Sequence, residues 1–310
     1  MNFKKPDFWD YKRVSFWSIL LFPLSLIFLL ISKTIRILKT QKKFPVPVIC
    51  VGNIYVGGTG KTPLALEIFN IIKSLGKNPG FVKKYYDYLD DEISMLKKAG
   101  ATFVSKNRID AIKNLIENKN DIAILDDGFQ DFTIKKNFSI LCFNQKQWIG
   151  NGFIMPSGPL REKLSAIKRA DCVIINGNKN IKIEDQIYKK NKNVKIFYSK
   201  YKPVNIDRFK DKKICAFAGI GNTSNFFDLL KDNKLNLINT ISFPDHYKLS
   251  KSDHEKLLFN SKDAVLLTTE KDYSRFINDS VIDKSAIEFL KIELEIENKS
   301  NFIELIKKNI

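Results

Sequence analysis

The sequence predicts an α/β fold in which a mainly parallel sheet is flanked by helices, with a second, smaller α/β domain and an N-terminal membrane helix. Three observations support this prediction. Short apolar runs rich in Val and Ile alternate with stretches of helical character, a pattern typical of buried parallel strands joined by helices. A glycine-rich turn follows the first of these runs, and a long uncharged segment precedes it. With 310 residues and 44% hydrophobic content, the chain can build a core in each of two domains.

The N-terminal apolar segment carries no charge from Val14 to Ser32. At about 1.5 Å per residue, its length barely matches a hydrocarbon core of about 30 Å. Pro23 interrupts the run, and a membrane helix tolerates proline better than a soluble helix does. A cleaved signal peptide is disfavoured because basic residues follow where a small-residue cleavage site should be. We predict a membrane anchor in residues 1–40, with a buried helix of a large soluble core as the alternative.

Basic residues flank this segment on both sides, so charge alone gives only a partial answer about its orientation. The heavier cluster follows the segment, which places the bulk of the protein at the cytoplasmic face. Whether the segment spans the bilayer or lies partly in its interface stays open. The flanking residues are Lys12 and Arg13 before it, and Lys33, Arg36, Lys39, Lys42 and Lys43 after it.

The formal charge of +18 comes mostly from lysine, since only seven of the 52 basic residues are Arg. Lysine is poorer than arginine at forked contacts with bases or phosphates. The basic residues are spread over every region, without a stripe of interleaved aromatics. Nucleic-acid binding is therefore disfavoured, and the charge favours attraction to an anionic surface or substrate. A lysine-rich bias of the whole genome would give the same composition.

Cysteine and histidine usage limits the metal chemistry. The four cysteines are far apart in apolar runs and form no C-x-x-C pair, which predicts buried thiols in a reducing compartment. With only two histidines, a His-based zinc site has little material, so any metal should have oxygen ligands. These residues are Cys50, Cys142, Cys172 and Cys215, with His246 and His254.

The glycine-rich turn follows a predicted buried strand, Pro45–Val51, and precedes a stretch of helical character, residues 64–69. Its main-chain amides are suited to phosphate oxygens, Lys61 to the β- and γ-phosphates of a nucleotide, and the Thr62 hydroxyl to Mg²⁺. The helix adds the positive end of its dipole. Strand, turn and helix together predict a P-loop that binds ATP through Tyr55, Val56, Gly57, Gly58, Thr59, Gly60, Lys61 and Thr62. Tyr55 stands where the strict P-loop pattern has its first glycine, and a plain structural turn is the alternative.

A second predicted strand, Asp121–Leu125, leads into two carboxylates, Asp126 and Asp127. A P-loop protein places the acid that orders its magnesium at the carboxyl end of such a strand. We therefore predict that Asp126 and Asp127 join Thr62 in a Mg²⁺ site. The alternative is an ordinary acidic turn or helix cap.

Six motifs in the same order make the chain resemble the tetraacyldisaccharide 4'-kinase family, the lipid A 4'-kinases. They cover residues 51 to 272, and the apolar N-terminal segment also agrees. The motifs are Val51–Pro63, Asp126–Gln130, Asn151–Glu162 followed by Arg169–Asp171, Gly219–Asn222, Phe243–His246 and Thr269–Asp272.

This resemblance implies a P-loop kinase that transfers the γ-phosphoryl group of ATP to the 4'-hydroxyl of a tetraacylated disaccharide 1-phosphate. It implies that Asp91, paired with His246, activates that hydroxyl. The implied partners are the acylated lipid substrate and the membrane surface, with no nucleic acid and no obligate protein partner. The implied location is the cytoplasmic face of the bacterial inner membrane. The implied contacts to substrate or phosphate are Arg108, Gln130, Arg161 and Glu162.

The chain departs from the family pattern at two places. The S-R-G-Y segment reads Lys83–Tyr86 and the following G-D-E-P context becomes residues 90–93, while the His-Arg pair after the D-D-G-F-Q motif becomes Asp131-Phe132. Two alternatives therefore stay open: a membrane-associated P-loop ATPase that acts on a protein partner, and a divergent nucleotide-binding homologue with weakened activity.

The predicted domains are the anchor at 1–40, a nucleotide-binding α/β domain at 41–205 and a smaller α/β domain at 206–310 that closes the active-site cleft. Strands are expected at Lys213–Ile220 and Asp263–Thr269, and a loop with weak helix at residues 178–193. Tyr201–Lys213 is the candidate hinge.

Overall fold

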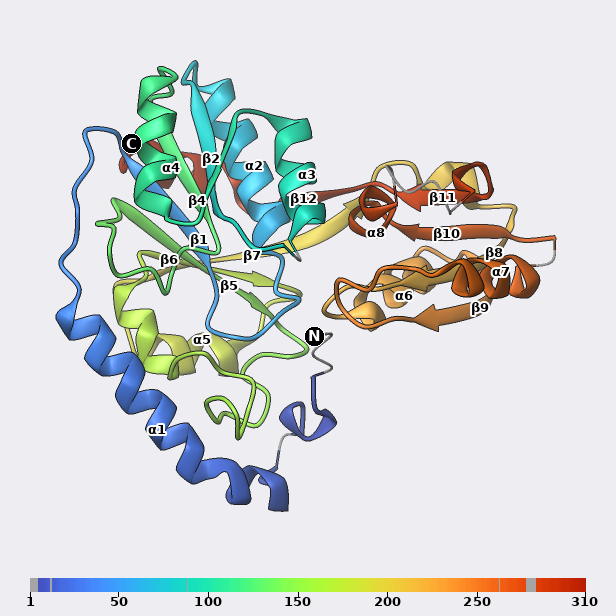
Figure 1. Cartoon of the computed structure of the whole chain (residues 1–310), viewed down its shortest axis with the longest axis horizontal. Helices are drawn as coiled ribbons and strands as arrows, with labels where there is room; N and C mark the ends of the chain where they lie inside the picture. Colours follow the sequence, from blue (N-terminus) through green and yellow to red (C-terminus); the bar gives the residue numbers. More distant parts are fainter. Residues whose placement is uncertain (1–4, 12, 88, 262, 277–282) are drawn as a thin grey trace. The chain divides into compact units, whose positions relative to one another are not determined.

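The structure is a computed structural model that describes residues 5–11, 13–87, 89–261, 263–276 and 283–310. Within these ranges the chain forms two compact units. The first unit comprises residues 5–85, 99–200 and 294–310, and the second comprises residues 86–98 and 201–293. Each unit is built around its own sheet (Figure 1).

The sheet of the first unit has eight strands in the order β12-β7-β6-β5-β1-β4-β2-β3, and the neighbours from β7 to β3 pair in parallel. In β1, β4 and β5 every residue is buried, as expected for strands covered on both faces. The strands are β1 (Val48–Gly52), β2 (Pro79–Lys84), β3 (Thr102–Ser105), β4 (Ile122–Asp126), β5 (Phe138–Asn144), β6 (Cys172–Asn176), β7 (Lys195–Pro203) and β12 (Ile292–Ile296).

Helices cover both faces of this sheet. Phe81 and Val82 are neighbours in β2, so their side chains point to opposite faces. Phe81 stacks on Phe69 of α2, with ring centroids 4.6 Å apart, whereas Val82 lies in the core cluster that α4 and α5 share. The helices are α1 (Phe16–Leu38), α2 (Lys61–Ser74), α4 (Arg108–Glu117), α5 (Ile181–Tyr188) and α9 (Lys299–Lys307), with the short 3₁₀ helices η1 (Asp7–Trp9) and η2 (Leu164–Arg169).

The second unit holds a four-stranded sheet in the order β11-β10-β8-β9, with parallel pairing throughout. Its core has one cluster on each side of β8, since Ile214 and Ala216 belong to one and Cys215 and Phe217 to the other. Its elements are β8 (Lys213–Ala218), β9 (Asn236–Ser242), β10 (Val265–Thr269), β11 (Ile287–Leu290), α3 (Asp90–Ala99), α6 (Thr223–Asp232), α7 (Lys251–Asn260), α8 (Glu270–Arg275), η3 (Ile206–Phe209) and η4 (Lys284–Ala286).

These elements confirm the predicted fold class: a mainly parallel sheet with flanking helices, a second sheet, and an N-terminal apolar helix. The four cysteines are buried free thiols. The strands predicted at 45–51, 121–125, 213–220 and 263–269 are present as β1, β4, β8 and β10, with no end shifted by more than three residues.

The compact units differ from the predicted domain ranges in two segments. Residues 294–310 group with the first unit, because β12 is the neighbour of β7 and Phe302 of α9 packs on Phe197, with ring centroids 5.3 Å apart. Residues 86–98 group with the second unit, where ion pairs join α3 to α8. The candidate hinge, Tyr201–Lys213, begins where residues 99–200 of the first unit end and the chain enters the second unit.

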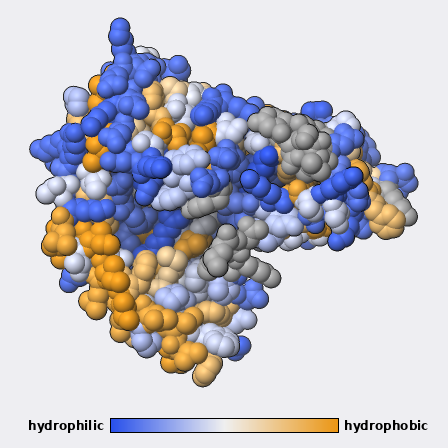
Figure 2. Space-filling view, viewed as in Figure 1, coloured by the Kyte–Doolittle hydropathy of each residue, from blue (hydrophilic) through white to orange (hydrophobic). Residues whose placement is uncertain are grey.

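The N-terminal helix α1 is long and apolar enough to cross a membrane, and only 11% of its most apolar window is buried. Its exposed side chains form the hydrophobic band along α1 in Figure 2. One polar stripe faces the first unit. Ser18 and Ser25, two turns apart, are buried, and the Ser25 Oγ lies 2.8 Å from the Ile154 carbonyl oxygen and 2.8 Å from the Ser157 Oγ. The middle of α1 therefore rests against the domain.

Candidate functional site

The loop after β1 has the backbone that a phosphate cradle needs. Gly57, Gly58 and Gly60 have φ values of 79°, 48° and 90°, in the left-handed region that favours glycine. Gly60 is the N-cap of α2, so the amides of this turn open onto a helix N-terminus. At Gly52, a Cβ would lie 2.4 Å from the Cβ of Phe129, and only glycine allows the two loops to approach this closely.

Not every predicted cradle residue can face a ligand. The Tyr55 side chain is fully buried, and its hydroxyl donates to Asp10. The Val56 amide donates to the Pro159 carbonyl. The Thr59 hydroxyl accepts a bond of 2.8 Å from the Asn53 amide group. The side chains of Tyr55 and Thr59 and the amide of Val56 thus hold the loop in shape. The main-chain amides from Gly57 to Thr62 are the part of the cradle that can face a ligand.

A buried polar cluster lies directly beneath this loop. Asp126, at the end of β4, is fully buried and accepts a bond of 3.1 Å from the Thr62 hydroxyl. The Lys83 ammonium group, from the end of β2, forms an ion pair with the same carboxylate oxygen, Oδ2. Strands β2 and β4 pair in parallel with Val82 opposite Leu125, so Lys83 and Asp126 are brought to one edge of the sheet. The other oxygen, Asp126 Oδ1, is buried without a hydrogen-bond partner among the described residues.

Asp127 points to a different set of partners. Its carboxylate lies 2.9 Å from Arg161 Nη1 and 3.8 Å from Lys61 Nζ. Burial tends to raise the pKa of Asp127, but Lys61 and Arg161 outweigh burial and lower it to about 2. The residue has a φ of 58°, a left-handed conformation that a non-glycine residue adopts at an energetic cost. The ionised carboxylate therefore fixes Lys61 and Arg161 beside the loop.

Three further predicted contact residues, Arg108, Gln130 and Glu162, are held by hydrogen bonds near the loop. Arg108 is largely buried and donates to the Asp127 carbonyl at 2.7 Å, so it braces the 127–131 turn. Gln130 donates to the Asn53 carbonyl at 2.8 Å and to Glu162 at 3.1 Å. Glu162 in turn accepts two bonds, of 2.9 and 2.8 Å, from Arg169.

The donor set beside the loop fits a hard cation better than a soft one. Thr62 and Asp126 supply adjacent oxygens, and the unpartnered Asp126 Oδ1 leaves one carboxylate oxygen open. No group of three or more His, Cys, Asp or Glu residues that could hold a metal occurs in the described part of the chain. Any metal here would need further ligands from phosphate oxygens and water. The predicted ligand Asp127 is instead occupied by Arg161.

In the second unit, two predicted residues 155 positions apart are in contact. His246 Nδ1 lies 3.1 Å from Asp91 Oδ2. Arg275 of α8 donates to the same oxygen from Nε at 2.7 Å, and Lys271 Nζ lies 3.8 Å away. The other oxygen, Asp91 Oδ1, accepts from the Glu92 amide at 2.7 Å. The Asp91 side chain is 1% exposed, whereas that of His246 is 18% exposed. The histidine is thus the more accessible member of the pair.

Charge in this cluster is closely balanced. Burial tends to raise the pKa of Asp91, but the hydrogen bond from His246 and the charges of Lys271 and Arg275 lower it to about 2. Burial tends to lower the pKa of Lys271, but Glu92, Asp245 and Asp91 outweigh burial and raise it. Asp91 is therefore an ionised hydrogen-bond acceptor at neutral pH, which orients His246.

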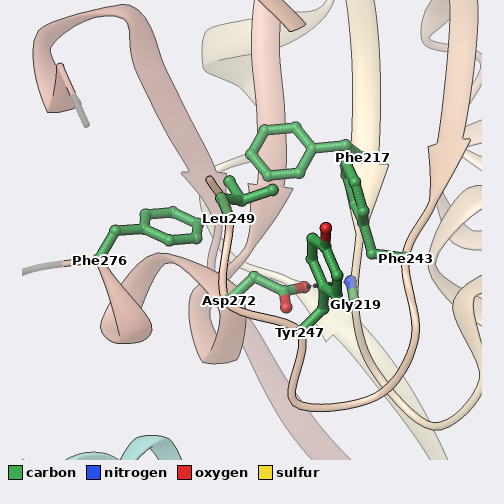
Figure 3. Close-up of a pocket in the computed structure, with 7 residues that line it drawn as sticks. All are labelled: Phe217, Gly219, Phe243, Tyr247, Leu249, Asp272 and Phe276. Atoms are coloured by element: carbon green, nitrogen blue, oxygen red, sulfur yellow. Dashed lines mark hydrogen bonds between the residues drawn. The ribbon is translucent and has the colours of Figure 1, made fainter. Parts of the chain in front are cut away.

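A pocket with several aromatic residues is lined in part by Phe243 and Tyr247, which lie on either side of His246 in the chain (Figure 3). Phe243 and Tyr247 stack with ring centroids 5.0 Å apart, and both line the pocket. His246 itself has a φ of 57°, and its amide donates to the Gly219 carbonyl. Asp272, at the pocket wall, accepts from the Gly219 amide at 3.1 Å. Packing and main-chain bonds together fix the position of the histidine.

Sequence reasoning missed two residues of these clusters, Lys83 and Arg275. Lys83 lies near the end of β2, the strand next to β4, which ends in Asp126. Knowledge of the strand order would therefore have pointed to Lys83. Arg275 lies one helical turn after the matched Thr269–Asp272 motif, and no pattern in the sequence ties it to Asp91. Lys271 lies inside the matched motif, but without an assigned role.

Comparison with known proteins agrees with this geometry. The family model described as "Tetraacyldisaccharide-1-P 4'-kinase" matches residues 17–310. A tetraacyldisaccharide 4'-kinase from Pelagibacter ubique is 44% identical, with 100% of this chain and 99% of the relative covered. One from Rickettsia typhi is 33% identical, with 98% of each chain covered.

Among solved structures, LpxK from Aquifex aeolicus, described in complex with ATP, matches with a TM-score of 0.71. It is 24% identical, and the match covers 94% of this chain and 98% of that one. This likeness concerns the fold. The family model and the relatives show that the chain belongs to the tetraacyldisaccharide 4'-kinase family, kinases that act on a sugar hydroxyl.

Proposed function

We propose that this kinase transfers the γ-phosphoryl group of ATP to the 4'-hydroxyl of a tetraacyldisaccharide 1-phosphate, which yields a bisphosphorylated lipid A precursor. The observation that carries the proposal is the contact between Asp91 and His246, because an enzyme that only hydrolysed ATP would not need a device for a sugar hydroxyl. The names of the relatives point to the same acceptor.

ATP is the proposed donor. The amides from Gly57 to Thr62 and the dipole of α2 would hold its phosphates, and Lys61 would contact the β- and γ-phosphates. Arg161, fixed by Asp127, adds a second cation beside the loop. Phosphoryl transfer requires mainly positioning and charge stabilisation, and these groups supply both.

Mg²⁺ is the proposed cation, held by Thr62 and Asp126. When bound with ATP, it would neutralise charge on the phosphates. Lys83 forms an ion pair with Asp126 Oδ2, which leaves Oδ1 as the open oxygen. Asp127 acts in this proposal as the partner of Lys61 and Arg161, a change from its predicted role as a metal ligand.

The Asp91–His246 pair is the proposed proton acceptor, with the two roles exchanged relative to the sequence-based expectation. Asp91 is almost fully buried, with donors on both oxygens, and its pKa of about 2 makes it a weak base. His246 is more exposed, and histidine is the side chain best suited to proton transfer near neutral pH. Asp91 would orient the ring, and His246 would take the proton from the hydroxyl.

The helix α1 is the proposed membrane anchor, and it would hold the protein at the cytoplasmic face of the bacterial inner membrane. Because Ser25 in its middle contacts the domain at Ile154 and Ser157, a helix lying in the interface fits better than one that spans the bilayer. Its exposed apolar side chains would enter the acyl region while its buried stripe stays on the protein. The lipid acceptor would then reach the site from the membrane surface.

The test uses the full-length protein in mixed micelles with labelled ATP and Mg²⁺, with and without tetraacyldisaccharide 1-phosphate. We expect label in the lipid fraction only when the acceptor is present. Phosphate release without acceptor would favour the ATPase alternative, and nucleotide binding without either product would favour a divergent homologue. Both results would contradict the proposal.

The exchange of roles has its own test, the dependence of the transfer rate on pH. His246→Gln should remove the fall in rate on the acidic side, because the proton acceptor is lost. Asp91→Asn should lower the rate while the acidic fall remains, since the proposed proton acceptor is still present. An acidic fall that persists in His246→Gln and disappears in Asp91→Asn would return the role of base to Asp91.

A further inference from the structure

Three cations gather around one aromatic ring, Phe132, in the first unit. The guanidinium carbons of Arg36 and Arg169 lie 5.3 and 4.9 Å from the ring centroid, and the Lys136 ammonium nitrogen lies 5.8 Å from it. Arg169 and Lys136 also lie 4.5 and 5.9 Å from the centroid of Phe129. Cation–π attraction accounts for each contact singly, but it does not explain why three like charges are brought together.

The acidic groups in contact with this cluster do not balance its charge. Glu162 pairs with Arg169 at 2.8 Å. Lys136 donates to the carbonyl oxygens of Phe129 and Asp131, which carry no formal charge. Arg36 makes no hydrogen bond or ion pair with any residue that the structure describes. The Asp131 carboxylate also acts on Lys136, but it pairs with Arg108 at 3.3 Å. Four cations and two carboxylates leave two positive charges, close to the complement of a phosphate monoester, which carries about −1.5 to −2.

The cations also disfavour one another. Burial lowers the pKa of Arg169, and the charge of Arg36 lowers it further. Burial likewise lowers the pKa of Lys136, with Arg169 and Arg108 among the groups that add to this effect. A bound anion would relieve this repulsion and complete the cluster. The Arg36 guanidinium can meet phosphate oxygens with paired N–H groups. Arg169 donates from Nη2 to Glu162, and its Nη1 has no hydrogen-bond partner among the described residues.

The position of the cluster connects it to both the membrane helix and the glycine loop. Arg36 lies in the last turn of α1 and is exposed. From Arg169, the hydrogen bonds pass through Glu162 to Gln130, and Gln130 bonds to the carbonyl of Asn53 at the start of the loop. One continuous row of polar side chains in the first unit thus runs from the loop to the end of the membrane helix.

We propose that Arg36, Lys136 and Arg169, grouped around Phe132, bind the 1-phosphate of the lipid acceptor. This inference rests on the proposed function, and it adds which end of the acceptor lies where. The 1-phosphate lies at the end of α1, Gln130 and Glu162 lie along the sugar, and the 4'-hydroxyl lies toward the glycine loop. The cluster selects acceptors that carry an anionic group at the end opposite the reacting hydroxyl.

The experiment compares two acceptors, the tetraacyldisaccharide 1-phosphate and the same disaccharide without its phosphate, with wild type and Arg36→Ala. Arg36 is exposed, so its removal does not disturb a core. For the phosphorylated acceptor we expect Arg36→Ala to raise KM about tenfold with kcat little changed, since one charge-assisted contact is lost. For the acceptor without phosphate the substitution should have little effect, because substitution and phosphate removal act on the same contact.

The matched control is Lys33→Ala, which removes a positive charge from the same helix without touching Phe132. It should leave the KM of both acceptors unchanged. Charge reversal in Arg36→Glu should raise the KM of the phosphorylated acceptor more than Arg36→Ala does. Binding to vesicles of neutral lipid with and without anionic phospholipid is measured in parallel for each variant.

Three outcomes would overturn the inference. If Arg36→Ala raised the KM of both acceptors by the same factor, the cluster would not bind the 1-phosphate. Loss of binding to anionic vesicles in Arg36→Ala but not in Lys33→Ala would assign the cluster to membrane phospholipid. An effect of Lys33→Ala equal to that of Arg36→Ala would reduce the cluster to general surface charge. If wild type fails to phosphorylate the acceptor at all, the proposed function itself fails, so the two failures are distinguishable.

Discussion

Aspartates in the two units have opposite surroundings, and the difference separates two kinds of chemistry. Asp126 in the first unit is buried with one carboxylate oxygen unpartnered among the described residues. Asp91 in the second unit accepts bonds on both oxygens, from the Glu92 amide on one and from His246 and Arg275 on the other. The first carboxylate has one oxygen without a hydrogen-bond partner among the described residues, whereas both oxygens of the second are bonded.

The two units also differ in whether their cations are balanced by carboxylates. Lys61 and Arg161 in the first unit lie beside a loop whose amides are also donors, an excess suited to a triphosphate. In the second unit, Lys271 and Arg275 are matched by Asp91, Glu92 and Asp272, so little charge is left over for a ligand. We infer that the first cluster holds a polyanion and that the second fixes the geometry of a proton acceptor.

The largest effect is expected from Asp91→Ala, because it leaves His246 unoriented and removes one partner of Arg275. The rate of phosphoryl transfer should fall by about a hundredfold to ten-thousandfold, with the KM for ATP little changed. The control is Asp90→Ala, which removes the adjacent, exposed carboxylate. Unchanged transfer by Asp91→Ala, measured with labelled ATP, would remove the second cluster from the chemistry.

Lys83→Met tests the buried ion pair of the first cluster. Removing one partner leaves Asp126 as an unpaired buried charge, so the free energy of unfolding should fall by about 3–5 kcal/mol in urea titrations. If Asp126 holds Mg²⁺, added Mg²⁺ with ATP should restore part of the loss. Lys84→Met, one residue along the same strand, is the matched control. A loss that Mg²⁺ and ATP leave untouched would argue against a cation at Asp126.

The fold and the first cluster could be predicted because their signals are contiguous in the chain. Gly57 to Thr62 is a single segment, and Asp126 follows an apolar strand directly. Parallel strands end at one edge of a sheet, so these two segments meet for a general reason. The Lys83 contact depends on β2 being the neighbour of β4, which periodicity cannot supply.

The second cluster is built from three separate segments, and local patterns cannot bring these together. Asp91 starts a helix where an acidic residue is expected as a cap, so its pairing with His246 followed only from the family resemblance. The assignment of residues 86–98 to the second unit, and of β12 and α9 to the first, depends on long-range packing. In the sequence, Asp131-Phe132 stands where the family pattern has a His-Arg pair, whereas the structure brings Arg36 and Arg169 to the Phe132 ring.

Lys61→Ala is expected to lower the transfer rate by about a hundredfold to a thousandfold, the range for loss of one preorganised charge at the reacting group. The free energy of unfolding should change little, because Asp127 keeps its bond to Arg161. Lys73→Ala, on the exposed side of the same helix, is the matched control. This combination separates a ligand-binding lysine from a structural one, and a large loss of stability would contradict the division between the clusters.

The smallest effect concerns acid unfolding. The pKa of Asp91 is lowered to about 2 from the ordinary 3.8, so Asp91 stabilises the fold above about pH 4 and loses that contribution as the pH falls toward 2. At neutral pH the contribution is about 2 kcal/mol. Asp127 has a similarly low pKa, but its side chain is 26% exposed and solvent screens its pairs, so its contribution should be smaller.

The free energy of unfolding should therefore decrease less between pH 4 and 2 in Asp91→Asn than in Asp127→Asn. Urea titrations at each pH measure this difference. Lys61→Ala offers a second comparison, because Lys61 is the largest single charge that lowers the pKa of Asp127. It should shift only the small contribution of Asp127. An equal decrease in the two asparagine variants would mean that the clusters are alike in how tightly they hold their carboxylates, which their surroundings do not allow.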